Sequence, residues 1–396
     1  MSEDNKKNKQ LIIILGLLNG LMPFSTDLYL PAFPEMARVL GTDIGQITLS
    51  MSTFFAGSCL GQLINGPLLD KFGRKKPMLL GLSLFLLTSL GCAVASNVSF
   101  LIVLRFFQAI GISICTVGSR AIVRDNFPVE KTASIFSSMA LVMGVSPIIA
   151  PSVGALVLQF YSWRAIFIML AIMSGSLIIA LSFFLSDNYI PEKQYSLRPK
   201  SILNTYTSVL KTPTFWSYSF VAALASGGLF TWISSSSFVF IKLLGLTESQ
   251  FGWLFATTGS CLLISNQSNR YFLKHFPSSQ IAIVAAFTQL FICALLVFIS
   301  IHFFSVPFML FGISCYMLSL HLITPNTMAL AIRPFSENIG SAAALMGSIQ
   351  MGLSTIVTVI LSNFQQASAL PMVITLSVIA LISSSTLYRL KQKNYA

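Results

Sequence analysis

The sequence GPLLDKFGRKKPMLLG, Gly66 to Gly81, connects two long apolar runs, 46–69 and 77–96. Gly73 permits a tight turn, and four Lys and Arg residues follow Asp70 within six positions. Apolar runs of about 20 residues are long enough to cross a bilayer as helices, and short connections rich in Lys and Arg are typical of cytoplasmic loops. The stretch therefore predicts two membrane helices joined by a tight turn on the cytoplasmic side.

The composition of the whole chain agrees with this local pattern. Apolar residues fill 55% of the 396 positions and charged residues only 9%, whereas a soluble domain has about a quarter of its residues charged. A water-soluble enzyme, a disordered chain and a collagen-like chain are all excluded by this balance. Charged residues or Pro and Gly separate twelve apolar runs: 11–30, 46–69, 77–96, 98–118, 132–157, 164–185, 214–239, 250–268, 279–300, 307–331, 339–362 and 370–388. The sequence thus predicts an all-α membrane protein with twelve transmembrane helices.

The formal charge of +12 is explained by topology. With the Lys-rich amino end in the cytoplasm, the inner side receives 20 of the 24 Lys and Arg, and the outer side only Arg38, Arg164 and Lys242. This asymmetry follows the positive-inside rule, so nucleic acid is not needed as a partner. We expect a multi-pass protein of the bacterial inner membrane with both termini in the cytoplasm.

The longest polar interruption, 186–213, divides the chain into two halves. We expect a six-helix bundle in 1–185, a cytoplasmic linker in 186–213 and a second six-helix bundle in 214–396. Within the linker, Ile202, Tyr206, Val209 and Leu210 recur at helical spacing, which favours a helix lying in the membrane interface. A disordered linker is the alternative.

Asp27 is the acidic residue with the most unusual position, because the other eleven fall at termini, loops or span ends. An ionisable group at membrane depth costs about 2.5–3.5 kcal/mol or more, which transport, protonation or a partner usually justifies. At 1.5 Å per residue, Arg105 in the fourth span reaches a similar depth, and Gln108 lies one turn below it. We expect Asp27 to gain and lose a proton as its hydration and its distance from Arg105 change. A permanent salt bridge between the two helices is the alternative.

Substrate-binding residues are harder to choose. The candidates are polar or aromatic residues inside spans of both halves: Asn19, Phe24, Gln108, Ser146, Trp232, Tyr316, His321, Asn326 and Gln350. Helix packing explains such residues equally well, and His321 is either a second titrating group or a satisfied buried imidazole.

Catalytic and metal-binding patterns are missing from the sequence. The six Cys residues lie in apolar runs with no CxxC pattern, and His275, His302 and His321 are dispersed. No GxxxxGK[ST] loop is present to bind nucleotide phosphates. We therefore expect neither an enzyme nor a metal site nor a cofactor, and a proton gradient as the energy source.

Several ordered motifs in residues 20–170 resemble one known family. The loop with Asp70, Gly73 and Arg74 resembles the signature loop of the major facilitator superfamily. The further motifs occur in the order seen in its Bcr/CflA branch of multidrug exporters: DLYLPAFP at 27–34, RFFQ at 105–108, SRAIVRD at 119–125, GVSPIIAP at 144–151 and WRAIF at 163–167. The second half resembles the family chiefly in hydropathy and length. Ala109 and Ala150 stand where the superfamily often has Gly.

The resemblance implies a role for each motif. Asp27 and Arg105 look like the proton-coupling pair. The implied cytoplasmic gate consists of Gly66, Asp70, Gly73, Arg74 and Asp125, with Asp70 also able to meet the start of a helix at Ser336-Glu-Asn. The implied antiporter motif consists of Gly144, Pro147, Pro151 and Gly154, for which a simple kinked helix is the alternative.

The fold implied is two pseudo-symmetric six-helix bundles that rock about a midplane cavity. We expect a monomeric, proton-coupled antiporter that exports drugs or other small amphipathic compounds by alternating access, with the small-molecule substrate, protons and the lipid bilayer as its partners. The alternative is a proton-coupled importer, or an exporter of one physiological solute such as a siderophore, sugar or amino-acid derivative. A sensor is disfavoured because no soluble output domain is present.

Overall fold

The computed structural model describes residues 3–127, 129–185, 206–335, 339–364 and 368–392. Within these ranges it does not describe the side chains of 3–9, 70, 124, 129–134, 136–138, 140, 141, 143, 144, 339 and 340.

Among the described residues, twelve helices have 19 or more residues and no strand is present. They are α1 (Glu3–Asp27), α3 (Ile44–Phe72), α4 (Lys75–Ala93), α5 (Val98–Asn126), α6 (Val129–Phe160), α7 (Arg164–Phe184), α9 (Pro213–Ser237), α10 (Glu248–Phe272), α11 (Ser278–His302), α12 (Val306–Ile332), α13 (Ile339–Ser362) and α14 (Leu370–Gln392). Three short elements, η1 (Leu30–Ala32), α2 (Phe33–Val39) and the π-turn η2 (Phe238–Leu243), complete the order. Each predicted span coincides with one long helix, so the predicted all-α fold is confirmed.

Ten helical segments in the described part are long and apolar enough to cross a membrane. Of α6, only Val145–Phe160 enters this comparison, as a shorter apolar helix. The helix α10 does not qualify, because its sequence contains many hydroxyl and amide side chains. Its position among spanning helices, rather than its own hydropathy, marks it as a membrane helix.

The first span differs from the predicted 11–30. The helix α1 ends at Asp27, and the chain continues through η1 and α2 as far as Val39. Pro31 and Pro34 lie in the first turns of η1 and α2, where a residue without an N–H group starts a helix more easily than it continues one. Asp27 is therefore at a helix end inside the protein, rather than within an unbroken helix.

Local signals define the other helix ends as well. Gly73 has φ +82°, so the turn between α3 and α4 uses the backbone freedom of glycine, as the sequence predicted. The side chains of Asp43 and Asn97 accept hydrogen bonds of 2.8 Å from the N–H groups of Gln46 and Phe100, which caps α3 and α5.

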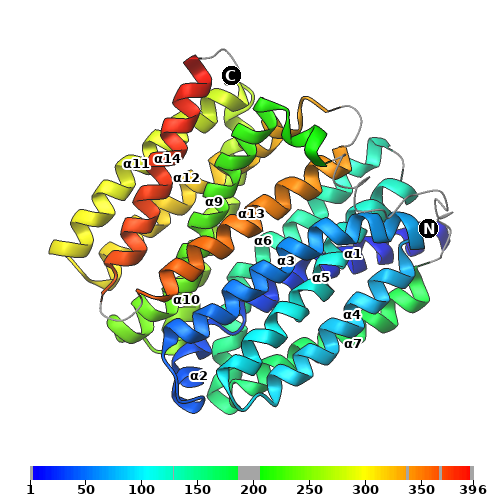
Figure 1. The fold of residues 1–396 in the computed structure, drawn as a ribbon, viewed down its shortest axis with the longest axis horizontal. Coiled ribbons are helices and arrows are strands. Elements are labelled where there is room, and N and C mark those ends of the chain that lie inside the picture. Colours follow the sequence, from blue (N-terminus) through cyan, green and yellow to red (C-terminus); the bar gives the residue numbers. More distant parts are fainter. Residues whose placement is uncertain (1–2, 128, 186–205, 336–338, 365–367, 393–396) are drawn as a thin grey trace.

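The helices form two groups (Figure 1). Helices α1 and α3–α7 pack with one another, and helices α9–α14 pack with one another. The groups meet where α3 packs along α13 and α6 along α10. They also meet at one end of the molecule, where η1 contacts α9 and α10, and α2 contacts η2; we call this the α2 end. Residues 186–205 of the expected linker lie outside the described residues, so the domain boundaries and the interfacial helix stay predictions.

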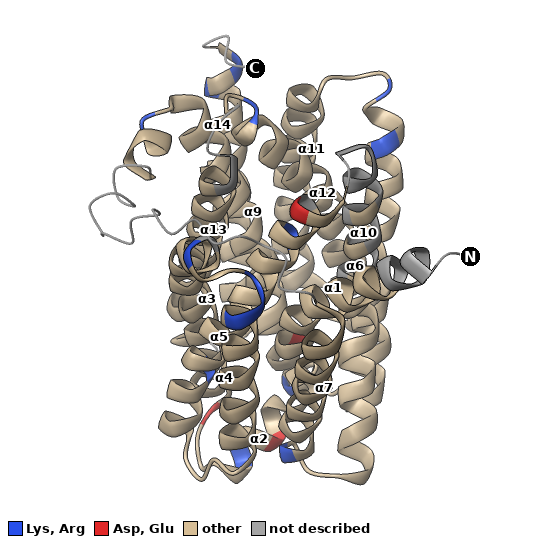
Figure 2. Ribbon diagram, turned by 90° about the vertical axis from the view of Figure 1, so that its right-hand side faces the viewer, with Lys and Arg blue, Asp and Glu red and all other residues tan. Residues whose placement is uncertain are grey.

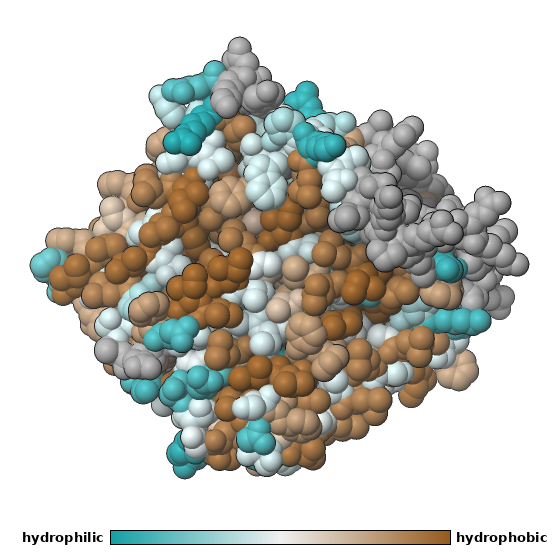
Figure 3. Space-filling model, viewed as in Figure 1, coloured by the Kyte–Doolittle hydropathy of each residue, from teal (hydrophilic) through white to brown (hydrophobic). Residues whose placement is uncertain are grey.

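The surface suits a bilayer. Large apolar side chains are highly exposed on the outside of the helices, among them Phe183 at 83% and Trp253 at 78%. Figure 3 shows apolar side chains across the middle of the face in view and hydrophilic ones toward its edges. Figure 2 shows few Lys and Arg residues along the helices and more of them where helices end. In water these apolar side chains would be unfavourably exposed, whereas lipid tails cover them.

Candidate functional site

Asp27 is buried at the end of α1, with 1% of its surface exposed. The hydroxyl of Thr26 donates a hydrogen bond of 2.9 Å to Asp27 Oδ1. No Lys, Arg or His nitrogen among the described residues forms an ion pair with this carboxylate. The acid is thus enclosed without a counter-ion in this conformation.

Arg105 of α5 is fully buried nearby and is held by neutral groups. Its Nη2 donates to the carbonyl oxygen of Ser25 at 3.0 Å, and its Nη1 donates to Gln108 Oε1. Gln108 Nε2 in turn donates to the hydroxyl of Ser89 at 2.6 Å, which extends the network to α4. Hydrogen bonds therefore connect α1, α5 and α4 through one guanidinium.

Aromatic rings surround the same guanidinium. The carbon Cζ of Arg105 lies 4.2 Å from the ring centre of Phe54, 4.6 Å from that of Tyr29 and 5.9 Å from that of Phe167. The negative ring faces stabilise a desolvated cation. The sequence analysis missed these rings and Ser89, because they come from separate helices. Residue spacing along the chain does not specify how separate helices are oriented relative to one another.

The predicted similar depth of Asp27 and Arg105 is confirmed, but the direct ion pair is not formed in this conformation. The reason lies in the end of α1. Because the helix stops at Asp27, the Ser25 carbonyl accepts no backbone hydrogen bond from the described residues and accepts one from Arg105 instead. The negative end of the helix dipole also favours a cation there.

The gate residues are brought together in part. Arg74 Nε donates to Asp125 Oδ2 at 2.9 Å, which joins the α3–α4 turn to the end of α5. Gly66 lies in α3 with open space beside it, so no contact there requires a glycine. The side chain of Asp70 and residues 336–338 lie outside the described part, so the expected contact between them is untested.

The antiporter motif places α6 against two other helices. A side chain at Gly154 would overlap the backbone carbonyl of Leu28, so α6 and the end of α1 approach closely. On the α10 side, Gly259 lies against Pro147 and Ile148. Pro147 and Pro151 are inside α6, and of Gly144 the structure gives only its place in that helix. The motif thus packs α6 between one helix of its own bundle and one of the other.

The expected substrate residues are spread over both bundles. Asn19 donates to the Leu15 carbonyl, Trp232 stacks on Phe255, and Asn326 donates to Asn269 Oδ1 at 2.7 Å. Phe24 and His321 are half-buried.

Three of the expected residues keep a polar atom without a partner. Ser146 Oγ, the Tyr316 hydroxyl and Gln350 Nε2 are buried and have no hydrogen-bond partner among the described residues. Buried orphan groups of this kind are available to a ligand. None of the expected substrate residues lines the hollow of about 330 Å³ that lies between α10, α11 and α12.

Two helical bundles that meet along two helix pairs, with a buried acid and a buried arginine in one of them, are typical of a membrane transporter. The family model of the Major Facilitator Superfamily matches residues 15–359, and the chain belongs to this family. It is a multi-pass membrane transporter and not an enzyme.

Proteins with similar sequences agree with this assignment. The chain is 30% identical to an uncharacterized MFS-type transporter of Bacillus subtilis, YdgK, covering 98% of this chain and 97% of the relative. It is 29% identical to the bicyclomycin resistance protein homolog of Haemophilus influenzae, covering 97% and 96%. It is also 29% identical to a chloramphenicol resistance protein of Pseudomonas aeruginosa, covering 92% and 86%. The resemblance to Bcr/CflA-type efflux transporters is therefore confirmed.

Solved structures support the fold independently. The crystal structure of a D-xylose-proton symporter matches with a TM-score of 0.76 at 13% identity, covering 96% of this chain and 97% of that one. At this identity the match concerns the fold alone.

Proposed function

We propose that the protein exports drugs and other small amphipathic compounds from bacteria in exchange for protons, and that Asp27 carries the proton. The relatives named for bicyclomycin and chloramphenicol resistance support the substrate class. The observation that carries the coupling role is the buried Asp27 carboxylate, which has no ion-pair partner among the described residues. A lone charge in such a place is costly, so the site must be neutralised or rehydrated as the protein changes conformation.

The contacts at the α2 end suggest how access to Asp27 is controlled. There, η1 and α2 pack against α9, α10 and η2, and Gln159 Nε2 of α6 donates to the Ser249 hydroxyl of α10 at 2.6 Å. In the proposed topology, with both termini in the cytoplasm of the inner membrane, the α2 end faces outward. The described conformation is then closed to the outside.

The proposed cycle follows from this arrangement. With the cavity open to the cytoplasm, Asp27 releases its proton and substrate binds. After the α2 end separates, Asp27 takes up a proton from outside and the substrate leaves. The Arg74–Asp125 pair on the inner side joins the α3–α4 turn to α5 within the N-terminal bundle, so it can hold that bundle together as the two bundles rock. The proposed cycle requires a single chain and no cofactor.

Replacing Asp27 with Asn tests the coupling role. The amide keeps the hydrogen bond from Thr26 but cannot exchange a proton, so substrate-driven proton movement in proteoliposomes should fall at least about 100-fold. Thr26→Val is the matched control, because it removes the hydrogen bond and leaves the carboxylate, and it should retain most of the activity. Proton movement at the wild-type rate in Asp27→Asn would contradict the role of Asp27.

The substrate class needs a separate test. Cells with and without the protein are grown across a panel of toxic compounds, and resistance to several amphipathic drugs is expected. Protection from none of them, together with accumulation of one nutrient, would support the importer instead.

A further inference from the structure

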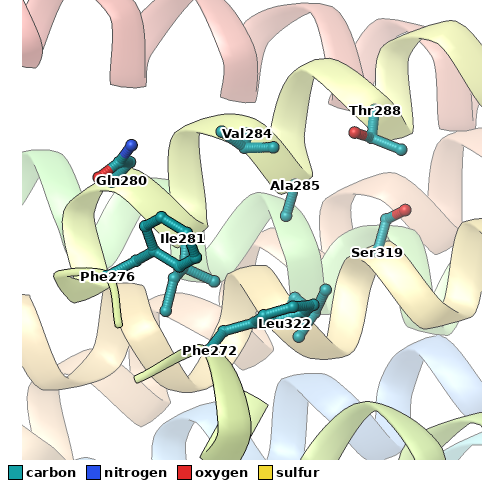
Figure 4. A pocket seen from close by; sticks show the side chains of 9 residues that line it. All are labelled: Phe272, Phe276, Gln280, Ile281, Val284, Ala285, Thr288, Ser319 and Leu322. Carbon is teal, nitrogen blue, oxygen red and sulfur yellow. The ribbon is translucent and has the colours of Figure 1, made fainter. Parts of the chain in front are cut away.

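A hollow of 330 Å³ lies on the outside of the C-terminal bundle, between the end of α10, α11 and α12 (Figure 4). Val284 and Phe276, which line it, are 59% and 47% exposed, so the hollow opens toward the surrounding membrane. It is lined by Phe272, Phe276, Gln280, Ile281, Val284, Ala285, Thr288, Ser319 and Leu322. We call this hollow the α11 groove.

The walls of the α11 groove suit a hydrocarbon chain. Six of its nine lining residues are apolar. Of the polar ones, Ser319 already donates its hydroxyl to the Cys315 carbonyl at 3.2 Å. Figure 4 shows Phe276 and Gln280 at one end of the groove and Thr288 and Ser319 at the other. The end with Phe276 and Gln280 is therefore the one next to the α10–α11 connection.

Lys and Arg residues lie in the chain near this end of the α11 groove. Lys274 lies in the chain between Phe272 and Phe276 and is exposed. Arg270 is also exposed, but it precedes Phe272 by two residues in α10 and therefore lies on the other side of that helix. His275 lies against Tyr271, with ring centres 5.1 Å apart. Figure 2 shows Lys and Arg in this connection, at the end of the molecule where the C-terminus lies.

The C-terminal bundle offers these cations almost no acidic partner. From Ser249 to the end of the chain the sequence contains one acidic residue, Glu337, against six Lys and Arg. Within the described residues, neither Arg270 nor Lys274 forms an ion pair. A negative group from outside the protein would therefore meet uncompensated positive charge beside an apolar groove.

We propose that the α11 groove binds an anionic phospholipid of the cytoplasmic leaflet. One acyl chain lies along Ile281, Val284 and Leu322, and the phosphate meets Lys274. Basic groups at the cytoplasmic ends of membrane helices attract acidic headgroups, and the apolar walls then select a chain over a free phosphate. A cationic drug would be repelled at the same place. The assignment of the groove to the cytoplasmic leaflet rests on the proposed topology. The preference for an anionic lipid does not depend on which substrate the protein transports.

Photo-crosslinking of the full chain in nanodiscs tests this proposal. The probe is phosphatidylglycerol with a diazirine in one acyl chain, and phosphatidylcholine with the same chain is the neutral counterpart. Labelled peptides are mapped by mass spectrometry. We expect the anionic probe to label peptides 272–288 and 319–322 preferentially, and Lys274→Gln to lower its preference over the neutral probe about fivefold. Lys211→Gln, which removes an exposed cation elsewhere, should leave the preference unchanged.

A second pair of variants tests the groove itself. Val284→Trp fills the groove from an exposed position and should reduce labelling by both probes, whereas Val378→Trp on the exposed surface of α14 should not. Equal labelling by the two lipids, labelling spread evenly over the lipid-facing helices, or displacement of the anionic probe by a cationic drug would each overturn the proposal.

Discussion

The two bundles bury different kinds of polar side chain. The N-terminal bundle encloses Asp27, Arg74 and Arg105, each at most 4% exposed. In the described part of the C-terminal bundle, the buried polar side chains are hydroxyls and amides. The two halves have the same number of long helices, yet among the described residues buried charge is found in the N-terminal half alone. The comparison indicates that charge chemistry is confined to one half, while the other contributes neutral surface for substrate and for packing.

Among the substitutions that test this difference between the bundles, the largest loss of transport is expected at Arg105. Arg105→Lys should lower drug–proton exchange in proteoliposomes at least about tenfold, because an ammonium cannot bond both Ser25 and Gln108 while stacking between rings. His321→Gln in α12 should stay within about twofold of wild type, since that imidazole has no place in the proposed proton path. The reverse ranking would show that the C-terminal bundle carries the proton as well.

A smaller effect is expected from two buried glutamines. Gln108 bonds Arg105 and Ser89, so Gln108→Leu removes one hydrogen bond from each of these buried groups and should cost about 1–3 kcal/mol of stability. Gln289 of α11 is equally buried, but its Nε2 has no hydrogen-bond partner among the described residues. Gln289→Leu should therefore be neutral or stabilising. Thermal unfolding in detergent measures the stability of both variants. Equal losses of stability would show that the interiors of the two bundles do not differ in this way.

The smallest expected effect concerns two close glycine contacts. A methyl group at Gly228 would overlap the Tyr316 hydroxyl, which has no hydrogen-bond partner among the described residues. Gly228→Ala should cost about 1–2 kcal/mol, and Tyr316→Phe in the same chain should restore most of it.

The corresponding control lies in the N-terminal bundle. At Gly154 the close neighbour is the Leu28 backbone carbonyl, so no side-chain change can rescue Gly154→Ala. If Tyr316→Phe failed to rescue Gly228→Ala in thermal unfolding, side-chain overlap would be the wrong explanation for that glycine.

Hydropathy predicted the fold well, because the bilayer demands long apolar helices. The orientation that the cations favour stays a prediction. The same reasoning missed the restart of the first span. Residues 28–34 carry no charge, and only Pro31 and Pro34 signal that α1 ends at Asp27. The apolar run 250–268 predicted α10, although α10 is not among the ten described segments that are long and apolar enough to cross a membrane.

For the site, the helical rise predicted that Asp27 and Arg105 reach one depth, but it could not predict their partners. A helix end frees the Ser25 carbonyl, and that detail decides where the guanidinium binds. The rings of Phe54 and Phe167 come from α3 and α7, whose rotation about their own axes is set by packing across the bundle. The roles of all these residues stay predictions until transport is measured.

The neutral partners of Arg105 have an electrical consequence. The Ser25 carbonyl, the Gln108 amide and the rings hold the guanidinium whether or not Asp27 carries a proton. In the proposed cycle the interior of the N-terminal bundle therefore alternates between a net charge of zero and one positive charge. A charge moved across the membrane gains about 2.3 kcal/mol per 100 mV, so the proton-loaded return toward the negative cytoplasm is the voltage-driven step. Expulsion of an uncharged compound would then draw on membrane potential as well as on the pH difference.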